Sequence, residues 1–282
     1  MSDRYRKILC VGWDADRVIY PGLSTSICAE KSTLDPEPYV NEFILRKWFT
    51  EDDVNRWCEE YNEGKGIASV GDVARMLTDF MYKMGIISKQ QTIEGKQAIL
   101  RGLTMKDIRK ISEEIEYNPG LREAVETFRK EGLYQTLFSD GLGPHITYQR
   151  RKLGMDAGKG ISPLIMLPGN EVVLYEDWHL AIDQATLTGS IEKMDKAKEF
   201  FKHVSKLGIP LSSVAVIDDS GSNVESLLLP VQREGGIAVG YNPTDAHRPK
   251  FEKASIPILK ETNLEAFAEI VLNPKKIGRY CE

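Results

Sequence analysis

Two aspartates, Asp14 and Asp16, end an apolar run that begins at Ile8, and their spacing is the first chemical signal in the sequence. Buried strands seldom end in two carboxylates, because an unpaired charge in the protein interior is costly. The pair therefore needs a partner of opposite charge. One carboxylate of such a pair can attack phosphorus as a nucleophile, and the other can give a proton to the leaving group.

Polar side chains also follow two later apolar runs, at 133–138 and 214–217, and one lysine begins a helical pattern. These residues are Ser139, Asp140, Asp218, Asp219 and Lys196. In a parallel sheet, ligands bind outside the carboxyl ends of the strands, at a topological switch point. Carboxylates gathered there repel one another unless a cation lies among them, and oxygen ligands suit Mg²⁺. A serine hydroxyl and a lysine ammonium could hold the oxygens of a transferring phosphoryl group.

The composition is that of a globular protein, with 282 residues, a hydrophobic fraction of 41% and a formal net charge of -5. This charge shows neither the basic footprint of a nucleic-acid-binding protein nor that of a protein bound to an anionic membrane. No apolar run approaches the roughly 20 residues of a membrane span, and the N-terminal run reads as a first strand and not as a signal peptide. The four cysteines are scattered without CxxC spacing, which favours a reducing cytoplasm.

Strand and helix signals alternate in the outer parts of the chain, which predicts a parallel α/β sheet. The short apolar runs that read as strands are 8–13, 133–138, 214–217, 236–239 and 256–259. The segment from 21 to 118 has few strand signals and several helical patterns. We therefore expect an α/β core formed by residues 1–20 and 119–282, with an all-helical module inserted at 21–118.

Four motifs, in this order, resemble those of the haloacid dehalogenase (HAD) superfamily. They are DADRV at 14–18, TLFSDG at 136–141, Lys196 within EKMDKAKEFF, and VAVIDDSGSNVESL at 214–227. Within that superfamily, the stretches 99–141 and 185–198 are similar to the phosphoserine phosphatase branch. The resemblance implies a Rossmann-like parallel-sheet core with an inserted helical cap of the C1 type, which agrees with the helical module expected at 21–118.

The resemblance also implies a role for each matching residue. Asp14 would be the nucleophile that forms an aspartyl-phosphate, and Asp16 would be the general acid and base. The residues implied to bind Mg²⁺ directly are Asp14, the backbone carbonyl of Asp16, and Asp219. Asp218 would then contact these ligands without binding the metal. Asn223 stands where the family often has another aspartate. The residues implied for phosphate are Ser139, Lys196 and Asp140, and Lys96 stands where the branch has the arginine that meets a substrate carboxylate.

The expected function is Mg²⁺-dependent hydrolysis of a small phosphorylated metabolite in the cytoplasm, without a nucleic-acid or membrane partner. The stretch YPGLSTS lacks the acidic residue that recognises the amino group in the phosphoserine branch, so phosphoserine is a poor candidate for the substrate. An EF-hand is excluded, because DADRVI lacks the sharp-turn glycine and the distal glutamate. A phosphotransferase or mutase, and a binding protein of the same fold without turnover, stay open as alternatives. The oligomeric state is not predicted.

Overall fold

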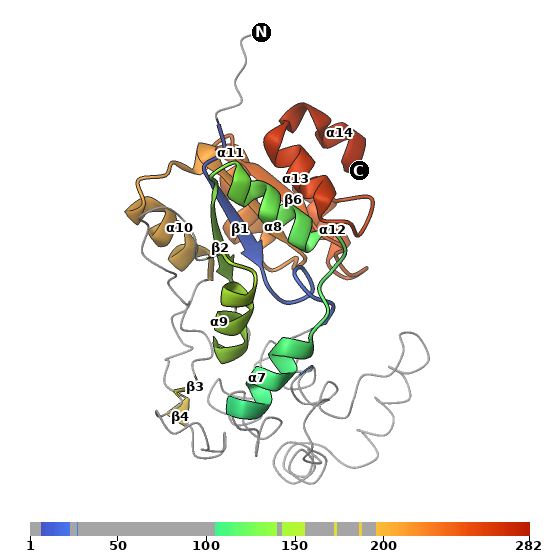
Figure 1. Cartoon of the computed structure of the whole chain (residues 1–282). Helices are drawn as coiled ribbons and strands as arrows, with labels where there is room; N and C mark the ends of the chain where they lie inside the picture. The colour runs from blue at the N-terminus through green and yellow to red at the C-terminus, as the bar shows by residue number, and fades with distance from the viewer. Residues whose placement is uncertain are drawn as a thin grey trace.

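A parallel four-stranded sheet forms the centre of the computed structural model, which describes residues 7–22, 27, 105–139, 143–155, 172–173, 186–187 and 196–282 (Figure 1). Its strands are β1 (Cys10–Asp14), β2 (Tyr134–Phe138), β5 (Val214–Asp218) and β6 (Ile237–Gly240), in the order β2-β1-β5-β6. Every residue of these strands is buried, as the near-continuous apolar runs predicted. The predicted parallel α/β fold is confirmed.

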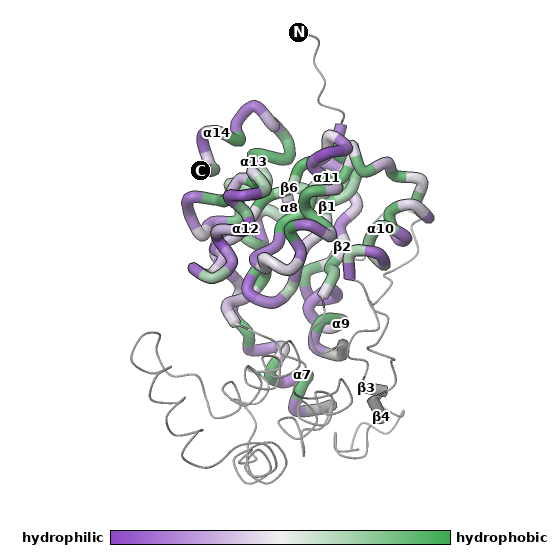
Figure 2. Tube along the Cα trace, turned by 180° about the vertical axis from the view of Figure 1, so that it is seen from behind, coloured by the Kyte–Doolittle hydropathy of each residue, from purple (hydrophilic) through white to green (hydrophobic). Residues whose placement is uncertain are grey.

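Helices cover both faces of the sheet, so the core has three layers. One face packs against α8 (Leu121–Lys130) and α13 (Glu265–Leu272). The elements on the other face are α10 (Lys196–Lys206), a π-helical turn (Val224–Leu228) that continues into α11 (Leu229–Arg233), and α12 (Arg248–Lys253). In Figure 2 the hydrophobic green segments gather in the sheet, while the surrounding helices alternate between green and purple. This alternation is typical of helices with one buried face.

The side chains of β1 alternate between the two faces, and this alternation decides on which side Asp14 lies. Trp13 packs against Phe267 of α13, with ring centroids 5.3 Å apart. Gly12 faces the opposite side, where a Cβ atom would lie only 2.7 Å from the ring of Phe200 in α10. Asp14 follows Gly12 by two residues, so it lies on the face that α10 covers.

The path of the chain reverses within the sheet. From β1 the chain goes to β2 on one side and then crosses to β5 on the other side of β1. In open α/β sheets, ligands bind outside the carboxyl ends of the strands at such a switch point. The strands that flank it here, β1 and β5, end in Asp14 and Asp218.

Short elements complete the described part of the chain. They are α7 (Met105–Glu114), α9 (Gly143–Lys152), the antiparallel pair β3 (Val172–Val173) and β4 (Thr186–Leu187), α14 (Ile277–Tyr280), and 3-10 turns at Leu211–Ser213 and Pro274–Lys276. Helix α7 belongs to the predicted helical module. Residues 23–26 and 28–104 lie outside the described residues, so the domain boundaries stay a prediction. Among the described helices, none has the length and apolar character needed to cross a membrane.

The strand predicted at 256–259 is wrong. In the described structure this segment makes isolated bridges, from Ile258 to Gly240 and from Leu259 to Cys281. Pro257 has no N–H to donate, so a continuous ladder cannot run through it. Its carbonyl still accepts a hydrogen bond from the Gly240 N–H, at 2.8 Å.

Candidate active site

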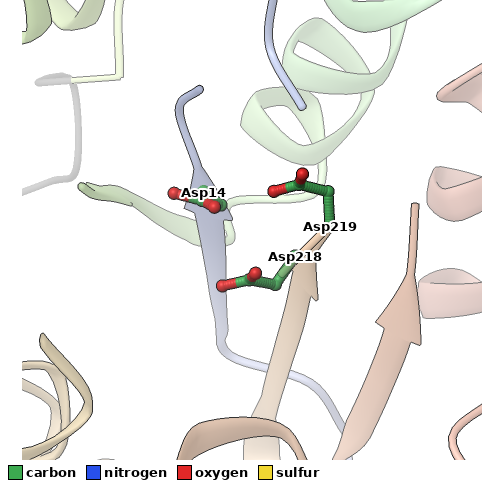
Figure 3. A group of neighbouring side chains, drawn as sticks. All are labelled: Asp14, Asp218 and Asp219. Carbon is green, nitrogen blue, oxygen red and sulfur yellow. The ribbon is translucent and has the colours of Figure 1, made fainter. Parts of the chain in front are cut away.

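Three carboxylates meet at the carboxyl ends of β1 and β5. Asp14 ends β1, Asp218 ends β5, and Asp219 follows it directly. One oxygen of each carboxylate lies within 4.8 Å of those of the other two, and all three side chains are buried. Figure 3 shows the carboxylates converging from the ends of the two strands. We call this group, together with Lys196, the acidic cluster.

Lys196, the first residue of α10, supplies a cation to the acidic cluster. Its ammonium Nζ lies 2.7 Å from Oδ1 of Asp14 and 3.4 Å from Oδ2 of Asp218. The ammonium also lies 4.8 Å from the centroid of the Phe138 ring at the end of β2, whose negative face attracts it. A lysine in the first turn of a helix opposes the helix macrodipole. The two carboxylates offset this cost, which accounts for the position of the lysine.

Asp218 and Asp219 have different surroundings, although they are adjacent in sequence. Oδ1 of Asp218 accepts a hydrogen bond from the Ser220 N–H at 2.7 Å, and Oδ2 accepts one from the Asn223 side-chain amide at 2.9 Å. Asp219 instead forms an ion pair with Arg17, whose Nη1 lies 3.7 Å from Oδ2 and whose side chain is 39% exposed. Asp218 therefore has a protein donor on each oxygen, whereas Asp219 has a longer contact with a partly exposed cation.

Burial and the crowding of carboxylates raise pKa values in the acidic cluster. Burial raises the pKa of Asp14 well above its usual range, the charge of Asp218 raises it further, and Lys196 acts against both. Burial and then the charge of Asp218 raise the pKa of Asp219 to about 7, against the pull of Arg17. These directions mean that the nearby cations do not neutralise the carboxylates fully.

The acidic cluster fits a divalent cation by charge and by ligand type. Its three carboxylates and one ammonium leave two negative charges when all are ionised. Its candidate ligand atoms are carboxylate oxygens, the ligand type that Mg²⁺ prefers in proteins. A cation with two positive charges would offset the burial and the carboxylate repulsion that raise the pKa values of Asp14 and Asp219.

Asp16 lies beside the acidic cluster in a tight turn that follows β1. In this turn Arg17 has a positive φ of 65°, and its N–H donates to the Gly22 carbonyl at 2.8 Å. The turn brings Tyr20 back to Asp16, whose Oδ1 accepts a hydrogen bond from the Tyr20 hydroxyl at 2.6 Å. The contacts of Arg17 and Tyr20 cannot be predicted from the sequence, because strand periodicity carries no signal for the conformation of a turn.

The other predicted site residues fall into two groups. Ser139 is buried directly after β2, and β2 pairs with β1 up to the register of Phe138 and Asp14, so Ser139 follows the strand next to Asp14. Asp140 and Lys96 lie outside the described residues. Their contacts with phosphate and with substrate stay predictions.

Comparison with known proteins finds similarity to several hydrolases. No protein-family model matches the sequence. A phosphoserine phosphatase of Streptomyces coelicolor is 22% identical over 181 residues, which are 62% of this chain and 39% of that protein. The structure of a substrate-bound phosphoserine phosphatase has a TM-score of 0.56 at 14% identity, over 94% of this chain and 98% of that one. A HAD-family hydrolase from Salmonella enterica has a TM-score of 0.55 at 12% identity, over 86% of this chain and 64% of that one.

This chain has the fold of the HAD hydrolases. The resemblance read from the four sequence motifs is thereby confirmed at the level of fold. The chain spans 39% of the length of the curated relative and 64% of the Salmonella hydrolase, so it matches part of each.

In this HAD fold, α7 precedes the segment that leads into α8, and polar side chains join α7 to α9. Gln149 and Lys152 of α9 donate to the backbone carbonyl of Ser112 in α7, at 2.9 and 3.2 Å. The Ser112 hydroxyl donates to the Ile108 carbonyl at 2.6 Å, so its oxygen accepts a hydrogen bond from Nδ1 of His145 at 2.7 Å. His145 therefore carries a proton on Nδ1, and burial lowers its pKa to about 4, which favours the neutral ring near pH 7.

Acid should lower the free energy of unfolding through His145, which lies at the contact between α7 and α9. Because the pKa falls from 6.5 to about 4 on folding, the unfolded chain takes up a proton first as the pH decreases. Stability is therefore lost between these two pH values, by roughly 2 to 3 kcal/mol. Denaturant unfolding of wild type and His145→Asn at about pH 7 and about pH 4.5 measures the loss. The wild type should lose more stability than the variant, and an equal loss in both proteins would contradict the prediction.

Proposed function

We propose that this protein is a Mg²⁺-dependent phosphatase that hydrolyses a small phosphorylated metabolite. One observation carries the proposal: a buried cluster of three carboxylates and a lysine lies at the switch point of a HAD-type sheet. The similarity to phosphoserine phosphatases in sequence and in structure supports it.

In the first step, Asp14 acts as the nucleophile. A carboxylate oxygen of Asp14 attacks phosphorus, the ester P–O bond breaks, and Asp16 gives its proton to the oxygen of the leaving alkoxide. The products are an aspartyl-phosphate at Asp14 and the free alcohol. Lys196, whose ammonium lies 2.7 Å from Oδ1 of Asp14, and Ser139 hold the phosphoryl oxygens on which negative charge develops.

In the second step, Asp16 acts as the base. Its carboxylate takes a proton from water while the water oxygen attacks the phosphorus of the aspartyl-phosphate. The bond between Asp14 and phosphorus breaks, inorganic phosphate leaves, and both aspartates return to their starting states. Mg²⁺, held by Asp14, Asp219 and the backbone carbonyl of Asp16, would offset the charge of the phosphoryl oxygens when bound. Asp218 orients Lys196 in this proposal and does not hold the metal.

The helical module at 21–118 acts as a cap in this proposal. A cap that closes over the acidic cluster would exclude bulk water and select the substrate. Lys96 lies in this module and would contact an anionic group of the substrate. Lys96→Ala should therefore raise KM for the best substrate and leave kcat nearly unchanged.

A panel of phosphate monoesters, phosphoserine among them, tests the proposed function. Inorganic phosphate is measured with and without Mg²⁺, and we expect release that depends on Mg²⁺ and stops when a chelator is added. Phosphate that appears on a second acceptor instead of in solution would identify a phosphotransferase or mutase. A wild-type protein no faster than Asp14→Asn with every ester would instead indicate a binding protein without turnover.

A further inference from the structure

Tyr20 lies next to the proposed general acid and base. Its side chain is fully buried, and its hydroxyl donates to Oδ1 of Asp16 at 2.6 Å, a typical length for a hydroxyl that donates to a carboxylate. Asp16 itself is only partly buried. A partly exposed carboxylate has several staggered rotamers open to it. The bond from Tyr20 selects one of them.

The ring of Tyr20 is held in place by His145 of α9, which is itself bonded to α7. It meets the ring of His145 in α9 edge-on, with centroids 5.1 Å apart and an interplanar angle of 77°. His145 is in turn bonded through Nδ1 to the Ser112 hydroxyl of α7 at 2.7 Å. Tyr20 also belongs to the main hydrophobic cluster of the core. Its hydroxyl therefore cannot follow Asp16 if the carboxylate rotates away.

The backbone between Asp16 and Tyr20 is fixed as well. The Asn118 side-chain amide donates to the carbonyls of Arg17 and Val18, at 2.9 and 2.8 Å. The Asn118 N–H donates to the Ile19 carbonyl at 3.0 Å. Asn118 lies on the segment that returns from α7 to the sheet. These bonds join the outgoing and returning segments of the chain and give the Tyr20 hydroxyl a fixed position relative to the end of β1.

We infer that Tyr20 is a positioning residue, which holds the Asp16 carboxyl group in the orientation needed for proton transfer. The inference rests on the proposed function, in which Asp16 first protonates the leaving alkoxide and then takes a proton from water. Tyr20 keeps its own proton in both steps. No motif that carries the resemblance assigns this residue a role.

The variant Tyr20→Phe removes the hydroxyl and keeps the ring that packs on His145. The matched control is Tyr241→Phe, because Tyr241 is also buried and its hydroxyl donates to the Thr262 carbonyl, at 2.9 Å, as part of the fold. The substrates are an alkyl phosphate, whose leaving group needs a proton, and p-nitrophenyl phosphate, whose leaving group does not. With the alkyl phosphate, Tyr20→Phe should lower kcat by roughly 10- to 100-fold.

Rapid mixing with p-nitrophenyl phosphate separates positioning from a general structural defect. The first step should stay fast in Tyr20→Phe and the second should become slow, so a burst of p-nitrophenolate should precede a slow steady rate. Tyr241→Phe should behave as wild type with both substrates. Wild-type rates in Tyr20→Phe, or an equal loss of burst and steady rate, would overturn the inference.

Crystal structures of wild type and Tyr20→Phe supply a readout that does not depend on turnover. We expect the Asp16 carboxylate to leave its position, or to adopt more than one, when the hydroxyl is absent. An unchanged single position would overturn the inference even if the variant were slow. If the wild type shows no Mg²⁺-dependent turnover, the proposed function fails, and the two crystal structures still decide whether Tyr20 positions Asp16.

Discussion

Asp14→Asn should abolish turnover and, in the absence of metal, should make the protein more stable. The loss of activity follows because an amide oxygen cannot form the aspartyl-phosphate, and the loss of a nucleophile lowers kcat by roughly 10⁴-fold or more. The gain in stability follows because the Asp14 carboxylate is buried beside Asp218 and its pKa is raised well above its usual range. Each unit of such a shift corresponds to about 1.4 kcal/mol of unfavourable ionisation.

The two effects are measured on the same preparations. Phosphate release is followed with Mg²⁺, and urea unfolding is followed with a chelator at about pH 8, where the buried carboxylates are forced towards ionisation. Asp245→Asn is the matched control, because Asp245 is exposed and lies outside the acidic cluster. We expect this control to match wild type in both measurements. An Asp14→Asn protein that retains activity, or that unfolds more easily than wild type without metal, would contradict the prediction.

The sheet and the strand ends of the site could be predicted because they depend on local patterns. A fully apolar run such as 214–217 is typical of a strand buried on both faces, and polar residues directly after such strands lie at one edge of a parallel sheet. This pattern predicts that Asp14, Asp218 and Asp219 lie close together, and they do so in the structure. The predicted position of Lys196 at a helix start is likewise observed.

The contacts that could not be predicted depend on backbone geometry between the patterns. The hydrogen bond from Tyr20 to Asp16 needs Arg17 in a left-handed conformation, which a non-glycine residue adopts rarely and which no spacing indicates. The apolar run at 256–259 satisfied the strand pattern, but the missing N–H of Pro257 interrupts the ladder there. The bonds of Asn223 and Ser220 to Asp218 depend on how the chain turns after β5. Periodicity describes which face is buried and does not describe how a turn closes.

Mg²⁺ should stabilise the protein far more at high pH than at low pH, and Asp219 should account for a measurable part of the difference. In the folded metal-free protein the pKa of Asp219 is raised from 3.8 to about 7. Between these values the folded state holds a proton that the unfolded chain has lost. The contribution of Asp219 to stability is therefore present at low pH and is lost as the pH rises through about 7. Metal ligands must be deprotonated, so the same rise in pH strengthens the binding of a cation.

Thermal and urea unfolding with Mg²⁺ or chelator, at about pH 5.5 and about pH 8, measures the coupling. At the higher pH, Mg²⁺ at about 100 times its dissociation constant should add about 2.7 kcal/mol, and at the lower pH much less. Sodium chloride at matched ionic strength controls for screening, which would act on exposed charges at both pH values. In Asp219→Asn the stability of the metal-free protein should fall less between the two pH values than in wild type, because only Asp14 of the acidic cluster keeps a raised pKa, and the gain from Mg²⁺ should be nearly lost. An equal Mg²⁺ effect at both pH values, or in the variant, would show that the cation binds elsewhere.

A gain that requires both the Asp219 carboxylate and its ionisation indicates a cation held among the three carboxylates. At that position the protons that the raised pKa favours and the cation compete for the same oxygens.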